Sequence, residues 1–173
     1  DAKKALVTGR LSKRLMVHGL DSFGAYFQLL SSGLHPDEVQ MAVDLLTTNE
    51  TYFFREQKHF DYMRETILPR FTPGKNFRVW SAAASTGEEP YSIAMLLKDA
   101  CSCDWELYCS DVNSSVIQQA KLGIYPEMRT QHIPEHYLRR FCRKGIRSQS
   151  GFIRVNAELR QSINFFTLNL HER

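Results

Sequence analysis

The chain has 173 residues, of which 43% are hydrophobic, so it can bury one ordinary core and a small additional module. Its longest apolar runs, such as residues 93–97, are far shorter than the roughly 20 residues that a membrane-spanning helix needs, so we expect no membrane insertion. The four cysteines, at positions 101, 103, 109 and 142, lack the spacing of a zinc site and indicate a reduced, cytoplasmic protein without a bound metal.

The net charge of +3 is small but unevenly distributed along the chain. Residues 125–160 contain eight Arg or Lys and only three Glu. A basic segment of this kind can bind nucleic acid, a membrane surface or an acidic protein, and it can equally be the solvated face of a helix. Charge alone leaves these four alternatives open.

Residues 1–70 are expected to form a helical domain. Apolar residues recur near the helical period in the first stretch, at Leu6, Leu11, Leu15 and Met16. Further helices are predicted over residues 23–30, 35–46 and 60–68, with proline near the start of the second and after the end of the third.

The pattern changes after residue 70, where strands and helices are predicted to alternate. A strand, a helix, a strand and a helix are expected over residues 77–84, 90–100, 105–110 and 114–122. This order predicts an α/β fold with a parallel sheet and crossover helices. Residues 152–155 and 163–168 resemble two more strands without a long helix between them, which favours an antiparallel hairpin.

Residues 81–92 join the first predicted strand to the following helix, and their small side chains let a ligand approach the backbone. The segment contains the single Gly87 rather than the three glycines of a dinucleotide-binding loop. Glu88 and Glu89 would repel a pyrophosphate and attract an ammonium group. S-adenosylmethionine, which carries a ribose and an ammonium group but no phosphate, fits this loop better than NAD or FAD.

Polar residues at two other places have more than one interpretation. Asp111 follows the second predicted strand, where a carboxylate can accept hydrogen bonds from both hydroxyls of a ribose, but it can also cap the next helix. Asn49, Thr51 and Arg55 lie in an apolar context upstream. Their simplest interpretations are helix caps for the first two and a surface ion pair for Arg55.

Two long motifs resemble the signature of CheR-type chemoreceptor methyltransferases: N-E-T-Y-F-F-R-E at residues 49–56 and V-W-S-A-A-A-S-T-G-E-E-P-Y-S-I-A-M at residues 79–95. Shorter matches follow in family order at residues 9–11, 110–111, 123–125 and 165–170. The resemblance implies an S-adenosylmethionine-dependent protein-glutamate O-methyltransferase that releases S-adenosylhomocysteine. It further implies a Rossmann-like methyltransferase sheet, incomplete here, in residues 71–173, an all-helical domain in residues 1–70, and a small antiparallel β-subdomain at about residues 146–168.

Carried over residue by residue, the resemblance implies seven cofactor contacts, which are Asn49, Thr51, Arg55, Glu89, Asp111, Asn169 and Leu170. Of the two adjacent acids in the loop, Glu89 is favoured over Glu88. Arg55 lies near the transferred methyl group in the family, so it is the expected catalytic residue. No general base is expected, because a glutamate carboxyl group with a reference pKa of about 4.3 is ionised at neutral pH.

The implied substrates are glutamates on the cytoplasmic domains of methyl-accepting chemoreceptors, which present acidic surfaces. Arg10, Lys13 and Arg14 on the first helix then form an expected docking stripe. The resemblance implies no nucleic-acid partner.

The chain ends where the family continues with further strands and additional cofactor contacts, so we expect residues 1–173 alone to be inactive or unstable. Two rival functions remain. One is a non-catalytic relative that binds the cofactor or a receptor, and the other is a nucleic-acid methyltransferase that uses the basic segment. The motifs present carry no disabling substitution, which favours the catalytic alternative.

Overall fold

The computed structural model describes residues 2–171, which form two compact units that divide between Thr48 and Asn49. The domain boundary expected at residue 70 is therefore wrong. Residues 49–70 belong to the larger unit because their apolar side chains are buried in its core, among them Phe53, Phe54, Phe60 and Leu68. The cofactor contacts expected from the helical domain thus lie in the same unit as the sheet.

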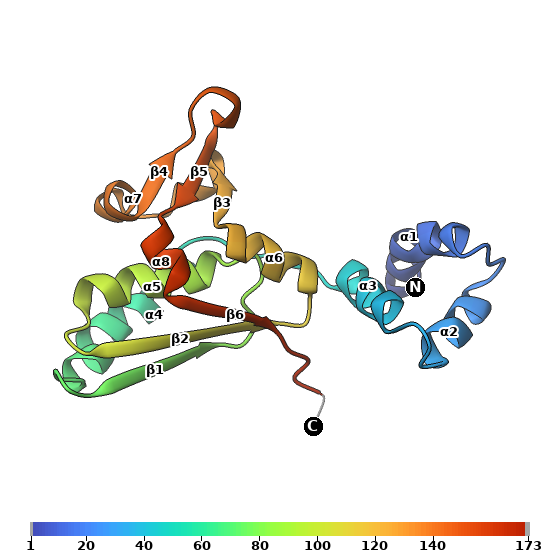
Figure 1. Cartoon of the computed structure of the whole chain (residues 1–173), viewed down its shortest axis with the longest axis horizontal. Coiled ribbons are helices and arrows are strands. Elements are labelled where there is room, and N and C mark those ends of the chain that lie inside the picture. Colours follow the sequence, from blue (N-terminus) through green and yellow to red (C-terminus); the bar gives the residue numbers. More distant parts are fainter. Residues whose placement is uncertain (1, 172–173) are drawn as a thin grey trace. The chain divides into compact units, whose positions relative to one another are not determined.

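The smaller unit is helical, as predicted, and appears in blue to cyan in Figure 1. Its helices are α1 (Ala2–Val17), α2 (Phe23–Ser31) and α3 (Pro36–Leu46). Ser22 caps α2 by accepting a hydrogen bond from the Ala25 N–H at 3.2 Å, and Pro36 occupies the first turn of α3. Leu11, Tyr26 and Ala42 bring the three helices together in one core.

A parallel sheet with the strand order β1-β2-β6 forms the centre of the larger unit. Its strands are β1 (Asn76–Ser81), β2 (Asp104–Asp111) and β6 (Ile163–Thr167), and the helices α5 (Glu88–Ala100) and α6 (Ser114–Leu122) follow β1 and β2 (Figure 1). The predicted β-α-β-α order is confirmed. Because Ser81 pairs with Cys109, the loops after β1 and β2 leave the same edge of the sheet.

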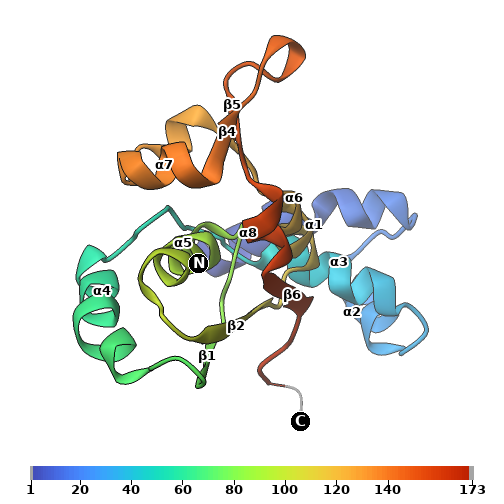
Figure 2. The same ribbon diagram turned by 60° about the vertical axis from the view of Figure 1, so that its left-hand side comes forward.

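Helix α5 covers one face of this sheet (Figure 2). Its side chains pack with Leu107 and Cys109 of β2, and its hydrophobic side chains with no exposed surface are Tyr91, Ala94, Met95 and Leu97. Side chains of the opposite face are exposed: Trp80 by 54% on β1, and Tyr108 and Phe166 on the neighbouring strands. The described part of the chain therefore leaves one face of its sheet uncovered, whereas parallel sheets are normally covered on both faces.

A second, antiparallel sheet has the order β3-β5-β4. Its strands are β3 (Ile124–Pro126), β4 (Cys142–Lys144) and β5 (Phe152–Val155), and α7 (Glu135–Phe141) precedes β4. A small antiparallel β-subdomain is therefore present, but its strands lie within residues 124–155 and not within about 146–168, and the predicted hairpin of residues 152–155 with 163–168 is wrong. The short helix α8 (Ala157–Gln161), capped by Asn156, leads the chain out of this sheet, and β6 then pairs in parallel with β2 (Figure 1).

The segment before β1 contains α4 (Gln57–Tyr62), which continues into a π-helical turn (Met63–Ile67) and a 3-10 turn (Leu68–Arg70). Two further 3-10 turns, Glu127–Thr130 and Arg147–Gln149, flank the strands of the antiparallel sheet. Within residues 2–171, no helix is both long and apolar enough to cross a membrane.

Candidate functional site

The loop between β1 and α5 is built around Gly87, which has a φ of 95° and forms the N-cap of α5. A Cβ atom at this position would lie 2.9 Å from both the Ala120 Cβ and the Tyr125 Oη. Glycine is therefore required by the left-handed backbone and by the close approach of the loop to α6. The single glycine of the loop thus has a conformational role that needs no pyrophosphate.

Asp111 joins the loop after β1 to the loop after β2. Its Oδ2 accepts a hydrogen bond from the Ser85 N–H at 2.8 Å and its Oδ1 accepts one from the Asn113 N–H at 2.9 Å, while the residue is only 8% exposed. The N-cap of α6 is Asn113, whose side chain accepts from the Val116 N–H at 3.0 Å. Because an ionised carboxylate has about four acceptor positions, Asp111 retains capacity for ligand hydroxyls.

A cavity of about 270 Å³ lies beside Asp111 and contains three of the seven expected cofactor residues. Its lining residues are Ala82, Ala83, Asp111, Val112, Leu168, Asn169, Leu170 and His171. Leu168 is held there because its N–H donates to the Asp111 carbonyl at 2.9 Å. The small side chains on one side and the acid and amide on the other suit a nucleoside, which needs both an apolar surface and a few placed polar groups.

The two adjacent acids of the loop have different environments. Glu88 is completely buried and accepts a hydrogen bond from the Thr86 hydroxyl at 2.6 Å through Oε2. Glu89 is exposed, and its Oε1 accepts from the Ser81 hydroxyl at 2.8 Å, at the carboxyl end of β1. Only Glu89 is accessible to a ligand, and this supports the preference for Glu89 over Glu88.

The segment of residues 49–56 is anchored by its aromatic side chains. Phe53 and Phe54 are buried, and the Phe54 N–H donates to the Ser92 hydroxyl of α5 at 2.9 Å. Arg55 is exposed and donates to the Glu50 carbonyl at 3.0 Å, with its guanidinium 5.8 Å from the centre of the Tyr52 ring. The hydrogen bond of Arg55 thus goes to a carbonyl of its own loop, and not to a carboxylate as the surface ion pair would require.

Helix caps do not explain the other two polar residues of this segment. The C-cap of α3 is Thr47 and the N-cap of α4 is Glu56, so neither Asn49 nor Thr51 caps a neighbouring helix. Phe54 and Glu56 have φ values of 54° and 57°, which are uncommon for residues with a side chain. Strained backbone of this kind is concentrated at functional sites and is retained where the surrounding packing fixes it.

Arg129, which sequence reasoning only counted as part of the basic segment, connects the two motifs. Its Nη2 donates to the Thr51 carbonyl at 3.0 Å and lies 2.7 Å from Glu88 Oε1, an ion-pair contact rather than an aligned hydrogen bond. A buried Glu88 requires a cation close by, but neither its burial nor a partner 41 positions away can be seen in the sequence. Arg129 positions the 49–56 segment against the loop.

We expect Arg129→Gln to lower the free energy of unfolding by about 3 kcal/mol, because it leaves Glu88 buried without its counter-ion. The double variant with Glu88→Gln should recover much of this loss, since no buried charge remains. Denaturant unfolding of the full-length protein measures both. The matched control is Arg139→Gln, whose exposed pair with Glu135 contributes less than about 1 kcal/mol. Equal losses in the single and double variants would contradict this role of the pair.

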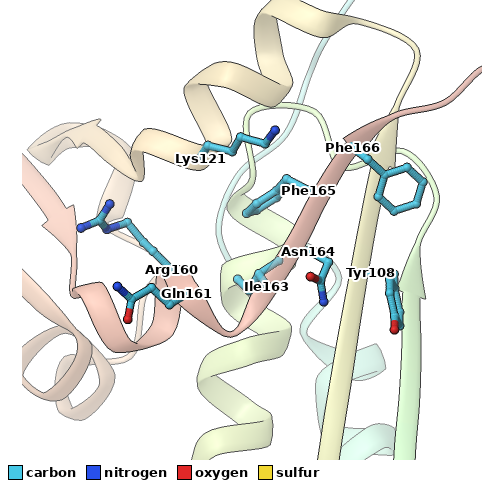
Figure 3. Close-up of a pocket in the computed structure, with 8 residues that line it drawn as sticks. All are labelled: Tyr108, Lys121, Arg160, Gln161, Ile163, Asn164, Phe165 and Phe166. Carbon is cyan, nitrogen blue, oxygen red and sulfur yellow. The ribbon is translucent and has the colours of Figure 1, made fainter.

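A larger cavity of about 740 Å³ lies along the edge strand β6 (Figure 3). Lys121 and Arg160 line one side of it, and the side chains of Tyr108, Asn164 and Phe166 line the other. It contains none of the expected cofactor residues. Among the described strands β6 pairs only with β2, so this cavity lies at an open edge of the sheet. We do not assign the cofactor to it.

The expected docking stripe on α1 is largely occupied within the helical unit. Arg10 donates to the carbonyls of Leu46 and Thr47, each at 2.8 Å, and so satisfies the end of α3. Arg14 pairs with the buried Glu38 at 2.5 Å. Of the three residues, only Lys13 is exposed, so Arg10 and Arg14 have structural roles that charge and spacing did not reveal.

The contacts of Glu38 make the helical unit sensitive to acid. The Arg14 guanidinium, helped by the hydroxyl of Tyr26 and by His18, lowers the pKa of Glu38 from 4.5 to about 2. A carboxyl group whose pKa is lowered on folding stabilises the protein above its unfolded pKa, and this stabilisation is lost as the pH falls towards the folded value. The window therefore runs from about pH 5 down to about pH 2.

We expect ionised Glu38 to contribute up to about 3 kcal/mol to the stability of this unit at neutral pH, since one pKa unit corresponds to about 1.4 kcal/mol. Circular dichroism during denaturant titration, repeated across that pH window, measures the loss. Glu38→Gln should be less stable at neutral pH and should lose most of the acid dependence. Asp37→Asn, which changes an exposed acid in the same turn, should retain it; equal behaviour of the two variants would contradict the assignment.

The basic segment of residues 125–160 is also partly neutralised by the chain itself. Arg140 pairs with Asp99 at 2.8 Å and Lys144 with Glu127 at 2.6 Å, in addition to the pair of Arg129 with Glu88. It is therefore not a uniformly free cationic surface.

The larger unit has a parallel sheet, two acids in the first turn of α5 and Asp111 at the end of β2. These features define a class of protein, the α/β domains that bind S-adenosylmethionine. The family model described as "CheR methyltransferase, SAM binding domain" matches residues 49–173, and the one described as "CheR methyltransferase, all-alpha domain" matches residues 1–47. The chain belongs to the CheR methyltransferase family. The two matches meet where the two structural units divide.

Curated relatives agree with this family. The chemotaxis protein methyltransferase of Escherichia coli is 40% identical over 98% of this chain and 59% of its own length, and that of Salmonella typhimurium is 39% identical over 100% and 60%. Chemotaxis protein methyltransferase 2 of Pseudomonas aeruginosa is 40% identical over 99% of the chain and 62% of its own length. The chain thus spans about three fifths of the length of these relatives.

Proposed function

We propose that the protein containing this chain transfers a methyl group from S-adenosylmethionine to glutamate side chains on the cytoplasmic domains of chemoreceptors. The observation that carries this proposal is the cavity in which Asp111, Asn169 and Leu170 meet the small residues of the loop after β1. The names of the relatives supply the chemotaxis context and the reaction class. The glutamate target is an expectation from the family resemblance, and the cytoplasmic location is an expectation from the cysteines.

The residues of the site fit this cofactor. Asp111 has free acceptor capacity for ribose hydroxyls, and the exposed Glu89 carries the charge that attracts an ammonium group. The Ser85 hydroxyl is buried and, within residues 2–171, has no hydrogen-bond partner, so it is available to a polar ligand. Asn169 and Leu170 offer an amide and an apolar surface to a base. The loop holds no cation that would balance a pyrophosphate.

The proposed reaction requires little proton transfer by the protein. The bound cofactor supplies a methyl group that is activated by its sulfonium. The accepting glutamate is ionised at neutral pH, so the protein needs only to orient the carboxylate, align it and exclude water. The exposed guanidinium of Arg55 suits the orienting role, because its planar fork matches a carboxylate. Arg129 keeps the segment that carries Arg55 in place.

The proposal is tested by incubating the full-length protein with labelled S-adenosylmethionine and a purified chemoreceptor cytoplasmic domain. Transfer to glutamate gives a methyl ester, so the incorporated label is released as volatile methanol in base. Cofactor binding without any transfer would contradict the proposal and favour a non-catalytic relative. Label that is stable to base, or that enters added nucleic acid, would also contradict it.

We expect residues 1–173 alone to show no methyl transfer and a lower melting temperature than the full-length protein. The reason is the exposed face of the sheet, where Trp80, Tyr108 and Phe166 lack the cover that a parallel sheet normally has. Differential scanning calorimetry and the same transfer assay measure this. Robust base-labile methylation by residues 1–173 would contradict the expectation.

A further inference from the structure

The short connection between α5 and β2 brings together two thiols. Cys101 and Cys103 are separated only by Ser102, and their Sγ atoms lie 2.7 Å apart, against about 2.04 Å in a disulfide bond. Both cysteines are free. The fold thus holds the two sulfur atoms close to bonding distance at the amino end of β2.

The elements on either side fix this arrangement. The Cys101 N–H donates to the Leu97 carbonyl at 2.9 Å, which closes the last turn of α5. Directly after Cys103, Asp104 begins β2 and pairs with Asn76 of β1. Because both flanks are ordered, bond formation between the sulfurs requires little further loss of chain entropy. Each thiol therefore has a high effective concentration towards the other.

The two thiols differ in accessibility. Cys101 is partly exposed, whereas Cys103 is buried. Burial, reinforced by the hydrogen bond with Cys101, raises the pKa of the Cys103 thiol. In such an arrangement the accessible thiol reacts with an external disulfide and forms a mixed disulfide. The shielded thiol then attacks this mixed disulfide and resolves it.

The other two cysteines of the chain lack these properties. Cys109 and Cys142 are buried in the core of the larger unit, and burial raises the pKa of both, that of Cys142 to about 11. Buried thiols of high pKa are inert towards disulfide exchange. They provide an internal comparison for the pair in the α5–β2 connection.

We propose that Cys101 and Cys103 form a reversible dithiol–disulfide site that is oxidised by small-molecule disulfides of the glutathione type. The Cys101 thiolate attacks the reagent, so one S–S bond of the reagent breaks as a mixed disulfide forms and one thiol leaves. Cys103 Sγ then attacks Cys101 Sγ and releases the second thiol. The protein loses two electrons and two protons, which reduce the reagent to two thiols.

This site is separate from the proposed cofactor site. Helix α5 has 13 residues, which corresponds to about 20 Å between the loop with Gly87 and Cys101. Cys103 directly precedes the eight-residue strand β2 and Asp111 is its last residue, so about 26 Å of extended chain lies between them. The inference therefore does not rest on methyl transfer, and each can fail without the other.

The test exposes the full-length protein to a graded ratio of oxidised to reduced glutathione and analyses it by intact and peptide mass spectrometry. We expect the peptide with residues 101–103 to lose the mass of two hydrogen atoms without adding glutathione, and to regain it with excess thiol. Its oxidation should proceed about tenfold or more faster than that of Cys109 and Cys142, because these are buried.

The variants Cys101→Ser and Cys103→Ser separate the two steps. Cys103→Ser should accumulate the glutathione adduct on Cys101, since no thiol resolves it, and Cys101→Ser should remain unmodified at Cys103. Circular dichroism checks that both variants are folded. The proposal is overturned if the wild type collects only the adduct on Cys101, or if residues 101–103 and the buried cysteines oxidise at the same rate.

Discussion

Asp111→Asn is expected to weaken binding of S-adenosylmethionine by the full-length protein about 10- to 100-fold, because a hydrogen bond to a charged group contributes about 1.5–3 kcal/mol. Asp111 lines the cavity beside Asn169 and Leu170, and its carboxylate already accepts from the two backbone N–H groups of the adjoining loops. The amide retains the shape but replaces one acceptor with a donor. Isothermal titration calorimetry measures the change.

A loss of affinity from Asp111→Asn can also come from a disturbed loop, because Ser85 and Asn113 both donate to this side chain. S-adenosylhomocysteine and its 2′-deoxy analogue separate the two causes. In the wild type, removing the hydroxyl should weaken binding about tenfold, and in the variant this difference should largely vanish. If the analogue loses the same factor in both proteins, Asp111 does not bind the ribose.

Arg55→Gln is expected to lower kcat/KM for methyl transfer about 100-fold, because the loss of a group that aligns donor and acceptor has consequences of this size. Arg55 is exposed, and its single hydrogen bond in the described structure, to the Glu50 carbonyl, leaves most of its guanidinium donors available. A role at the reacting carboxylate predicts that kcat falls with kcat/KM. Steady-state kinetics with a receptor cytoplasmic domain provide both values.

Lys58→Gln is the matched control, since it removes an exposed cation from the neighbouring helix α4. We expect this variant to retain nearly full activity. Arg55→Lys should recover only part of the loss, because the ammonium lacks the planar fork of the guanidinium. Equal activity of the two Gln variants would show that Arg55 contributes only general positive charge.

The parts of the fold that could be predicted have strong local signals. An apolar run before Ser81 predicts a strand, and the small residues of the loop and the acids after Gly87 predict a turn and the start of a helix. The structure has β1 and α5 there. Asp111 is predicted to follow the second strand, and the structure has it as the last residue of β2; its contact with the ribose stays a prediction. The preference for Glu89 over Glu88 comes from the family resemblance and stays a prediction, which the burial of Glu88 and the exposure of Glu89 support.

The parts that could not be predicted depend on contacts between distant residues. Strands β3 and β4 have three residues each, too short for a periodic pattern, so the antiparallel partners of β5 were invisible in the sequence. Without them β6 was assigned to the wrong partner. The pair of Arg129 with Glu88 spans 41 positions, and Arg10 reaches the end of α3 from α1. Such pairings cannot be predicted from charge and spacing along the chain.

The central claim is that the cofactor binds in the cavity beside Asp111 and not in the larger cavity along β6. A crystal structure of the full-length protein with S-adenosylhomocysteine tests it most directly. We predict that the ribose hydroxyls lie within hydrogen-bonding distance of the Asp111 carboxylate, with the adenine beside Asn169 and Leu170. Density for the ligand against Tyr108, Asn164 and Phe166, with the cavity at Asp111 empty, would contradict the claim.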